Sequence, residues 1–135
     1  MKTFHLQVVT PDGEAFDAQA EKVVCRTIYG DVCVLADHSD YCTALGMGEA
    51  HIVAEGKTRR AACIGGMLSV MQNEVRLVAT TWEWEEDIDL VRANLAKERA
   101  EKQLAAKEKL NKREISLAEA RLKRALVRSS LKGGN

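Results

Sequence analysis

The sequence predicts an all-β sandwich of about ten strands followed by an antiparallel hairpin of two α-helices, and two observations carry this prediction. Across residues 1–84, apolar side chains recur at every second position between turn signals, which is typical of half-buried strands. Residues 85–132 contain no Gly or Pro and are rich in Ala, Leu, Lys, Glu and Arg, all good helix formers. The charge balance changes at the same point, from seven Lys/Arg and eleven Asp/Glu before residue 85 to thirteen and nine after it. We therefore expect two domains, at 1–84 and 85–135.

The first domain should contain eight to ten short strands over residues 2–82. The stretch "TFHLQVV" places Phe4, Leu6 and Val8 on one face of a first strand, and "TPDG" marks the turn after it. Further turn signals separate the later apolar runs; they are Gly46 and Gly48, Glu55-Gly56-Lys57, Gly65-Gly66 and Gln72-Asn73. Many short strands at this spacing favour a sandwich or a flattened barrel.

The second domain should form helices over about 86–108 and 113–130, with Asn111 in the turn between them. The acidic residues at 85–89 stand at the start of the first helix, where the helix dipole favours negative charge. Two apolar stripes follow the helical period; the first is Ile88, Val91, Leu95, Ala100 and Leu104, and the second is Ile115, Ala118, Leu122, Ala125 and Leu126. Because alanine buries little area, we expect a hairpin of only modest stability that a partner could open or a ligand could close.

Composition argues against several classes of function. The formal net charge is zero, which gives no bulk attraction to nucleic acid or to a membrane surface. No apolar run approaches the ~20 residues that span a bilayer, and the N-terminus lacks the continuous apolar core of a signal peptide. The four cysteines (Cys25, Cys33, Cys42 and Cys63) form no CxxC pair and have no histidines clustered with them in sequence. We therefore expect a soluble, cytoplasmic protein with four reduced, mostly buried cysteines, no metal site, no nucleic-acid partner and no direct membrane insertion.

Five segments of the chain are informative when they are taken together. They are "LQVVTPDG", "GDVCVLADHSDYCTAL", "IGGMLSVMQNEVRLVAT", "DIDLVRANLAKERAE" and "LKRALVR". In this order and at these spacings they resemble the epsilon subunits of bacterial F-type ATP synthases over nearly the whole chain. The second segment keeps Gly30, Leu35 and His38 of the family pattern Gly-Glu-x-Gly-Ile-Leu-Pro-Gly-His-Ala-Pro. It departs from that pattern with Asp31 in place of Glu and Cys33 in place of Gly, and with "AD" and "SD" where Pro-Gly and Ala-Pro are common.

The resemblance implies a non-catalytic rotor subunit of a proton- or sodium-translocating ATP synthase. Such a subunit is a ten-stranded sandwich followed by two helices, requires no cofactor, and joins the gamma subunit of the central stalk to the c-ring. Its helices fold onto the sandwich, or extend into the catalytic alpha/beta head and inhibit ATP hydrolysis. The resemblance implies a peripheral position on the cytoplasmic face of the bacterial plasma membrane, with Asp31 and His38 on the face that meets the c-ring.

Some members of that family bind ATP as a regulatory ligand without hydrolysing it. The resemblance places "IDLVRA", from Ile88 to Ala93, on the family's ATP-recognition motif. It implies an ATP-binding set of Glu83, Ile88, Asp89, Arg92, Ala93, Arg99, Arg124 and Arg128. The spacing is compatible, because residues 89, 92, 96 and 99 fall along one helical face and the arginines of the second helix recur at intervals of three and four. The alternative is an ordinary Asp89–Arg92 pair on a solvated face, with no ligand.

Three other functions remain open from the residues alone. A free-standing ATP-binding sensor of the same fold would bind nucleotide without co-purifying with an ATP synthase. An enzyme that uses a cysteine would lose activity on Cys63→Ser, although no nucleophile–base pair is visible in the sequence. A coiled-coil adaptor for nucleic acid would show steeply salt-dependent DNA binding.

Overall fold

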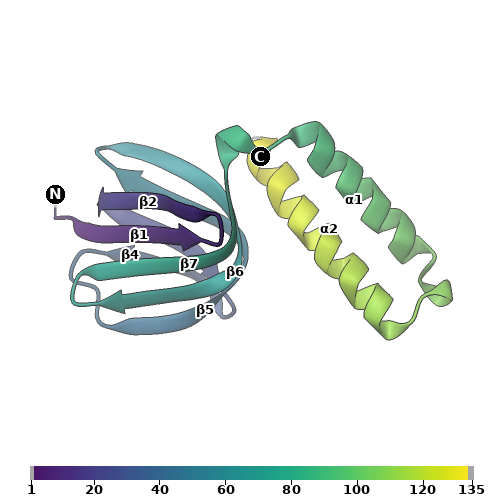
Figure 1. The fold of residues 1–135 in the computed structure, drawn as a ribbon, viewed down its shortest axis with the longest axis horizontal. Helices are drawn as coiled ribbons and strands as arrows, with labels where there is room; N and C mark the ends of the chain where they lie inside the picture. The colour runs from purple at the N-terminus through teal and green to yellow at the C-terminus, as the bar shows by residue number, and fades with distance from the viewer. Residues whose placement is uncertain (1, 134–135) are drawn as a thin grey trace. The chain divides into compact units, whose positions relative to one another are not determined.

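The structure is a computed structural model that describes residues 2–133, and the chain divides into two compact units, Met1–Trp84 and Glu85–Asn135 (Figure 1). The first unit contains the strands β1 (Phe4–Thr10), β2 (Gly13–Ala20), β3 (Lys22–Thr27), β4 (Gly30–Leu35), β5 (Tyr41–Ala54), β6 (Lys57–Met71) and β7 (Glu74–Trp84). The second contains a 3₁₀ turn η1 (Glu85–Asp87), helix α1 (Leu90–Ala105), a second 3₁₀ turn η2 (Lys107–Lys109) and helix α2 (Lys112–Lys132).

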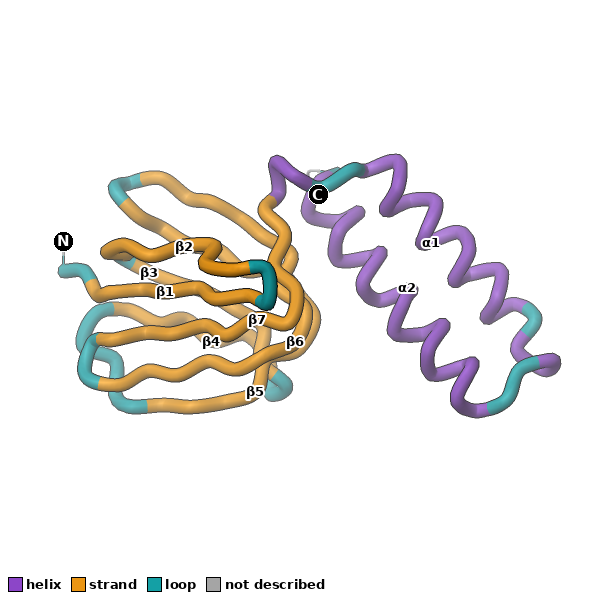
Figure 2. Tube along the Cα trace, in the orientation of Figure 1, coloured by secondary structure: helices purple, strands orange, loops and turns teal. Residues whose placement is uncertain are grey.

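The seven strands form one sheet in the order β2-β1-β7-β6-β5-β3-β4, which folds over on itself (Figure 2). All neighbours are antiparallel except β1 and β7, which run parallel. Strand β2 contacts β5 although three strands separate them in the sheet, so the two layers close on each other. Between the layers lies one apolar core to which β1 contributes Phe4, Leu6 and Val8 and the other layer contributes Val23 and Ile52. This architecture confirms the predicted sandwich followed by a helical hairpin.

The strand count is seven, and the sequence prediction of eight to ten was wrong because it treated internal glycines as turns. Gly46 and Gly48 lie inside β5, and Gly65 and Gly66 lie inside β6. The ladders continue on both sides of Gly46, Gly65 and Thr80 but omit these residues from the pairing, so β5, β6 and β7 pass through the irregularity as long strands. Dividing each of these three strands there would bring the count to the predicted ten.

Both helices begin at capping side chains. The Asp89 carboxylate accepts a hydrogen bond from the backbone N–H of Arg92 at 3.1 Å, and α1 starts at the next residue. Asn111, in the connection where the sequence placed the turn, caps α2 by accepting from the N–H of Glu114 at 2.8 Å. The predicted first helix, at about 86–108, was therefore too long at both ends, because 85–87 and 107–109 form separate 3₁₀ turns. The second helix runs two residues beyond the predicted residue 130.

The seam between α1 and α2 is built from alanine. Ala93 and Ala100 are buried on α1, and Ala118 and Ala125 are buried on α2, each pair seven residues apart. The predicted stripe was wrong at Val91 and Leu95, which are 69% and 48% exposed, whereas Ile88 and Ala100 are buried and Leu104 is half-buried. Leu126 on α2 is exposed as well. At 100° per residue, Val91 and Leu95 point away from the side of α1 that carries the buried alanines.

Gly66 and Gly56 allow a direct test of how closely β6 and β7 approach each other at the irregularity in β6. Gly66 has a φ of +127°, and a Cβ there would lie 2.0 Å from the carbonyl oxygen of Val78 on β7. Gly56, in the β5–β6 turn, has a φ of +74° but nothing within 4 Å of the same position.

We expect Gly66→Ala to destabilise the sheet by about 3 kcal/mol or more, because it combines backbone strain with a clash between neighbouring strands. Gly56→Ala should cost only the left-handed backbone term of about 1–2 kcal/mol. Urea unfolding followed by the fluorescence of Trp82 and Trp84 measures both values. Equal losses in the two variants would show that the close approach at Gly66 does not constrain the sheet.

Candidate functional site

An open groove of about 640 Å³ runs along the hairpin between α1 and α2. Helix α1 lines it with Ala96, Arg99, Ala100, Lys102 and Gln103, and α2 lines it with Arg121, Arg124, Ala125 and Arg128. The alanines end at their Cβ atoms, so they form a low floor, and the long side chains stand at the margins. The helical period explains the alignment, because residues 96, 99 and 103 on α1 and 121, 124 and 128 on α2 are spaced three and four apart.

The groove is strongly cationic. Five of its nine lining residues are arginine or lysine, and none of the nine, all within the described part of the chain, is acidic. Among the described residues, no hydrogen bond or ion pair joins Arg99, Arg121 or Arg124 to another side chain. Guanidinium groups that converge on an open cavity repel one another unless an anion lies between them, and their planar forks match the oxygens of phosphate. The groove is therefore suited to a polyanionic ligand.

The structure brings together three of the predicted ligand-binding residues: Arg99, Arg124 and Arg128 all line the groove. Arg92 is exposed on the same helix but does not line it, and lies about 10 Å before Arg99 at 1.5 Å per residue. The predicted ligand set left out Arg121, although the spacing argument included it, and Lys102; they stand three residues from Arg124 and Arg99. That spacing was the available signal for both.

The other predicted residues have clear structural roles. Ile88 is buried just before the helix, and Ala93 is buried in the alanine seam, so neither side chain faces solvent. The Asp89 side chain caps α1. Glu83 belongs to the first unit, on β7. The stretch "IDLVRA" thus explains the start of α1, because Ile88 and Ala93 are buried and Asp89 caps the helix. Of its two charged side chains, Arg92 is the one that does not cap the helix.

Two polar contacts hold the open end of the hairpin. The Ser129 hydroxyl donates to Oδ1 of Asn94 at 3.0 Å, and Nζ of Lys132 donates to the carbonyl oxygen of Glu85 at 3.1 Å. Both contacts join the segment 85–94, at the start of the second unit, to the last two turns of α2. With the buried alanines they close the hairpin at the end opposite η2, and the groove lies between these contacts and the η2 turn.

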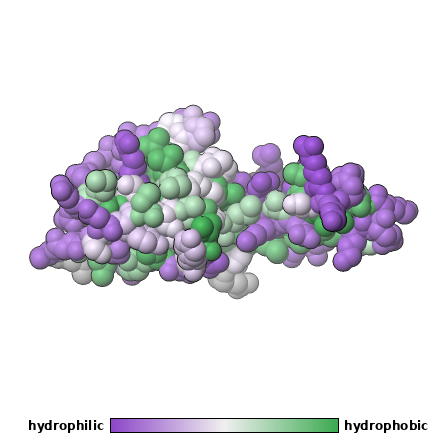
Figure 3. All heavy atoms as spheres, turned by 90° about the horizontal axis from the view of Figure 1, so that it is seen from below, coloured by the Kyte–Doolittle hydropathy of each residue, from purple (hydrophilic) through white to green (hydrophobic). Residues whose placement is uncertain are grey.

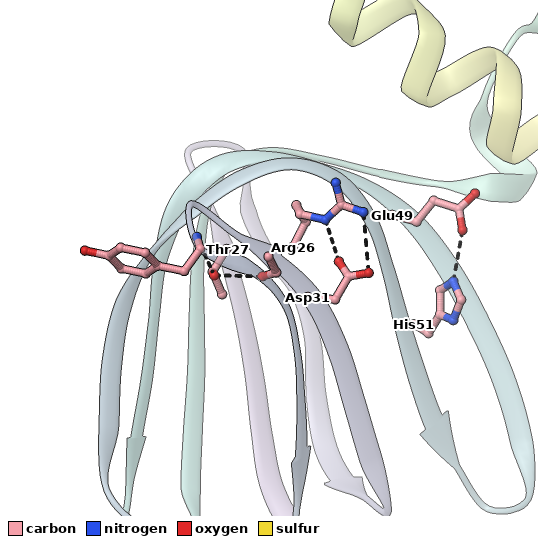
Figure 4. Close-up of polar contacts among 7 residues, drawn as sticks. Arg26, Thr27, Asp31, Glu49 and His51 are labelled. Carbon is pink, nitrogen blue, oxygen red and sulfur yellow. Dashed lines mark hydrogen bonds and ion pairs between the residues drawn. The ribbon is translucent and has the colours of Figure 1, made fainter.

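Asp31 and His38, the predicted c-ring contacts, lie near opposite ends of β4. Asp31 is the second residue of that strand and accepts from Nε of Arg26 at 2.5 Å (Figure 4), and the guanidinium lowers the pKa of the carboxyl. His38 follows the strand in the loop before β5, and its Nδ1 bonds the carbonyl of Ser39 at 2.7 Å. The turn beside Asp31 exposes Ile28 by 60% and Tyr29 by 84%.

An apolar row crosses the outer face of the sheet. Val9 pairs with Val78, Val78 pairs with Met67, and Met67 pairs with Ala44, so the row crosses β1, β7, β6 and β5. Met67 and Val78 are exposed. One face of the molecule shows hydrophobic and hydrophilic side chains intermixed over the sheet (Figure 3). We call Val9, Val78, Met67 and Ala44 the apolar row; lateral neighbours of this kind form a ready docking surface.

The buried cysteines are not suited to nucleophilic chemistry. Burial raises the pKa of Cys25 and of Cys63 to about 12, so both thiols stay protonated near neutral pH. Cys33 and Cys42 are exposed. The predicted burial was therefore right for Cys25 and Cys63 and wrong for Cys33 and Cys42, which lie at outward-facing strand positions.

Comparison with known families matches both units. The family model described as the beta-sandwich domain of the ATP synthase delta/epsilon chain matches residues 3–85, and the long alpha-helix domain of the same chain matches residues 86–133. Within the described residues, no helix combines the length and the apolar character needed to cross a membrane.

Curated relatives are similar over almost their whole length. An ATP synthase epsilon chain of Caldicellulosiruptor bescii is 40% identical over 97% of this chain and 94% of its own. One from Caldanaerobacter subterraneus subsp. tengcongensis is 38% identical over 94% and 91%. Among solved structures, a chain of the Euglena gracilis mitochondrial ATP synthase OSCP/F1/c-ring assembly has the same fold, with a TM-score of 0.80, 22% identity and coverage of 90% and 76%.

The cap at Asp89 predicts an effect that needs no ligand. Asp89→Ala should destabilise the hairpin by about 1 kcal/mol, because the first helical N–H groups lose their acceptor, whereas Asp89→Ser should retain most of that stability. Thermal melts of the nucleotide-free chain, followed by helical circular dichroism, measure the difference. If Asp89→Ser lost as much as Asp89→Ala, the carboxylate would contribute through something other than capping.

Proposed function

The chain belongs to the ATP synthase delta/epsilon chain family, and on that premise we propose that it is the epsilon-type rotor subunit of a bacterial F-type ATP synthase whose hairpin binds ATP and regulates hydrolysis. Epsilon chains are non-catalytic, so the subunit would act on the catalysis of its complex and carry out no reaction itself. The observation that carries the regulatory part of the proposal is the cationic groove between α1 and α2.

Assembly would use the first unit. The apolar row offers a continuous patch without charge, which suits a stable protein contact, and we assign it to the gamma subunit. The β3–β4 turn, with exposed Ile28 and Tyr29 beside Asp31, suits the c-ring. Both predicted c-ring residues have exposed apolar neighbours, which are Ile28 and Tyr29 beside Asp31 and Leu35 beside His38. In this position the subunit would rotate with gamma and the ring, at the cytoplasmic face of the membrane, and couple them during ATP synthesis and proton or sodium transport.

ATP in the groove would act as an effector. Arg99, Arg121, Arg124 and Arg128 would hold the phosphates, and the ligand would bridge both helices only while they are closed. A ligand that binds one conformation shifts the population toward it, so ATP would favour the closed hairpin. The gain is RT ln(1 + [ATP]/Kd), or about 2.7 kcal/mol at a hundredfold excess over Kd. In the groove's lining no acidic residue offers a magnesium ligand or a hydrolytic base, which fits binding without cleavage.

Inhibition would come from the open hairpin. The seam of Ala93, Ala100, Ala118 and Ala125 buries small side chains, so the closed state has a modest advantage. Once opened, the cationic face could extend along gamma and meet acidic surfaces of the catalytic alpha/beta head. The rival function, a free-standing ATP sensor of the same fold, shares the groove but has no use for the apolar row. Recovery of gamma with the tagged chain from detergent-solubilised membranes would exclude that rival.

Calorimetric titration of the isolated chain tests the groove. We expect ATP to bind uncleaved and to raise the melting temperature of the hairpin. Arg124→Ala should weaken binding about ten- to a hundredfold, because charge-assisted hydrogen bonds worth roughly 1.5–3 kcal/mol are lost. Lys123→Ala removes the same charge from the adjacent exposed position, outside the groove, and should leave affinity nearly unchanged. An equal loss in both variants would reduce the effect to bulk charge, and no heat at millimolar ATP would remove the ligand from the proposal.

Deletion of residues 86–135 tests the division of labour between the two units. We expect the shortened chain to assemble with gamma and the c-ring, since the apolar row and the β3–β4 turn remain, and the assembled enzyme to hydrolyse ATP faster. Hydrolysis should be measured at low ATP, where the closed state is least populated and inhibition strongest. Unchanged hydrolysis by a fully assembled enzyme would contradict a regulatory role for the hairpin.

A further inference from the structure

His5, on the outer face of β1, is held between carboxylates of the two neighbouring strands. Its Nδ1 lies 2.6 Å from Oε2 of Glu74 on β7, and its Nε2 is hydrogen-bonded to Oδ1 of Asp17 on β2. The strand register accounts for this placement, because His5 pairs with Glu74 in the parallel ladder and side chains on one face of neighbouring strands are adjacent. A single imidazole thus links three strands of the sheet.

This geometry requires the doubly protonated imidazolium. An ionised carboxylate only accepts hydrogen bonds, and a neutral imidazole has one N–H donor and one bare lone pair. With carboxylates at both nitrogens, the neutral ring would leave a lone pair facing a carboxylate oxygen. Loss of one proton therefore breaks one of the two contacts, whichever tautomer remains.

The charged groups around the ring favour the protonated state. The acidic groups are Asp17 and, hydrogen-bonded to it, Glu14 on β2, and Glu74 on β7. The cation on β7, Arg76, would disfavour protonation, and its Nε donates to Gln7 of β1 at 3.0 Å. The hydrogen bonds to Asp17 and Glu74 raise the pKa of His5, and the bond from His5 lowers the pKa of Asp17. Glu14 acts in the same direction on Asp17, because its hydrogen bond also lowers the pKa of Asp17, and the same bond raises the pKa of Glu14.

The contacts tie down one edge of the sheet. Strand β2 is at the sheet's edge, with β1 as its one neighbour in the strand order. Glu74 directly follows the tight turn at Gln72 and Asn73, both of which have positive φ, and the backbone N–H of His5 donates to the carbonyl of Asn73 at 3.2 Å. We propose that His5 is a proton-operated clasp, which in its imidazolium form ties β2 to β7 across β1 and on losing a proton to solvent releases one of these two strands.

The sign of the pH dependence follows from the clasp. Because the pKa of His5 is raised in the folded chain, its contribution to stability is complete below the unfolded value of about 6.5 and is lost as pH rises through the higher, folded value. For each unit by which the folded pKa exceeds the unfolded one, the unfolding equilibrium constant should rise about tenfold across this window. Protection of β2 amides from hydrogen exchange should fall over the same range.

Two measurements on the full chain test the clasp. Nuclear magnetic resonance titration of the histidine side chains, from about pH 5 to about pH 9, should give His5 a higher pKa in the folded chain than in a short peptide that contains it. Melting temperatures over the same range should fall with pH in the native chain. That fall should flatten in His5→Gln, and Asp17→Asn and Glu74→Gln should each lower the His5 pKa.

His38→Gln serves as the matched control, because His38 lies in a loop and its ring bonds a backbone carbonyl instead of a carboxylate. It should keep the pH dependence of the native chain. The clasp is overturned if the pKa of His5 in the native chain is equal to or lower than its pKa in the peptide, and this measurement needs no variant. It is also overturned if His5→Gln retains the full fall in melting temperature.

Discussion

Close approach of two helices across alanine is the constraint on which the hairpin depends. Among the described residues, Ala93 and Ala100 on α1 and Ala118 and Ala125 on α2 are all but one of the buried side chains of the two helices, the exception being Leu131 near the end of α2. The same choice fixes the groove, since Ala96, Ala100 and Ala125 supply its floor and larger residues there would fill it. Stability and the capacity to hold a ligand are therefore set by the same positions. A leucine seam would give a firmer hairpin with no room between its cationic margins.

Charge placement follows from that seam. Once the buried stripe is fixed, the positions that border it on each helix are fixed as well, and in this chain the borders of the groove carry arginine. Arg99 and Arg124 directly precede the buried Ala100 and Ala125, and Arg121 and Arg128 lie four residues before and three residues after Ala125. The closed hairpin thus gathers like charges that the open one would separate. An anion and the alanine seam act on the same equilibrium, one by neutralising charge and the other by burying methyl groups. Under the proposed function, repulsion among the arginines opposes the seam, and an anion that relieves this repulsion would favour the closed hairpin.

The sequence carried the architecture and three of the five cationic residues of the groove, which are Arg99, Arg124 and Arg128. The change from a period of two to a helical period at residue 85 is visible without coordinates, as are the arginine spacings. The strand count was not, because glycine has the same local preference in a turn and at an irregularity inside a strand; only the partner strand decides between them. Val91 and Leu95 were misplaced for a similar reason. Hydrophobicity alone ranks Val91 and Leu95 above alanine for burial. Which side of α1 is buried depends on how the two helices pack, and the side that is buried carries alanine. Arg121 was within reach of the spacing argument and Ile88 already stood in the predicted apolar stripe, whereas the burial of Ala93 needed the packed seam.

The parallel pairing of β1 with β7 has a consequence for biosynthesis. His5 pairs with Glu74, so the first strand finds its central neighbour only after nearly the whole first unit has been made. Until β7 leaves the ribosome, β1 can pair with β2 alone, and a two-stranded ribbon is marginally stable in water. The hairpin, by contrast, joins neighbouring helices through a short connection and can form as it is synthesised. During translation the sheet should therefore be completed late, and the helices that follow should fold almost at once. Before β7 is made, one edge of β1 has no partner strand, and in this interval the nascent chain most needs a chaperone.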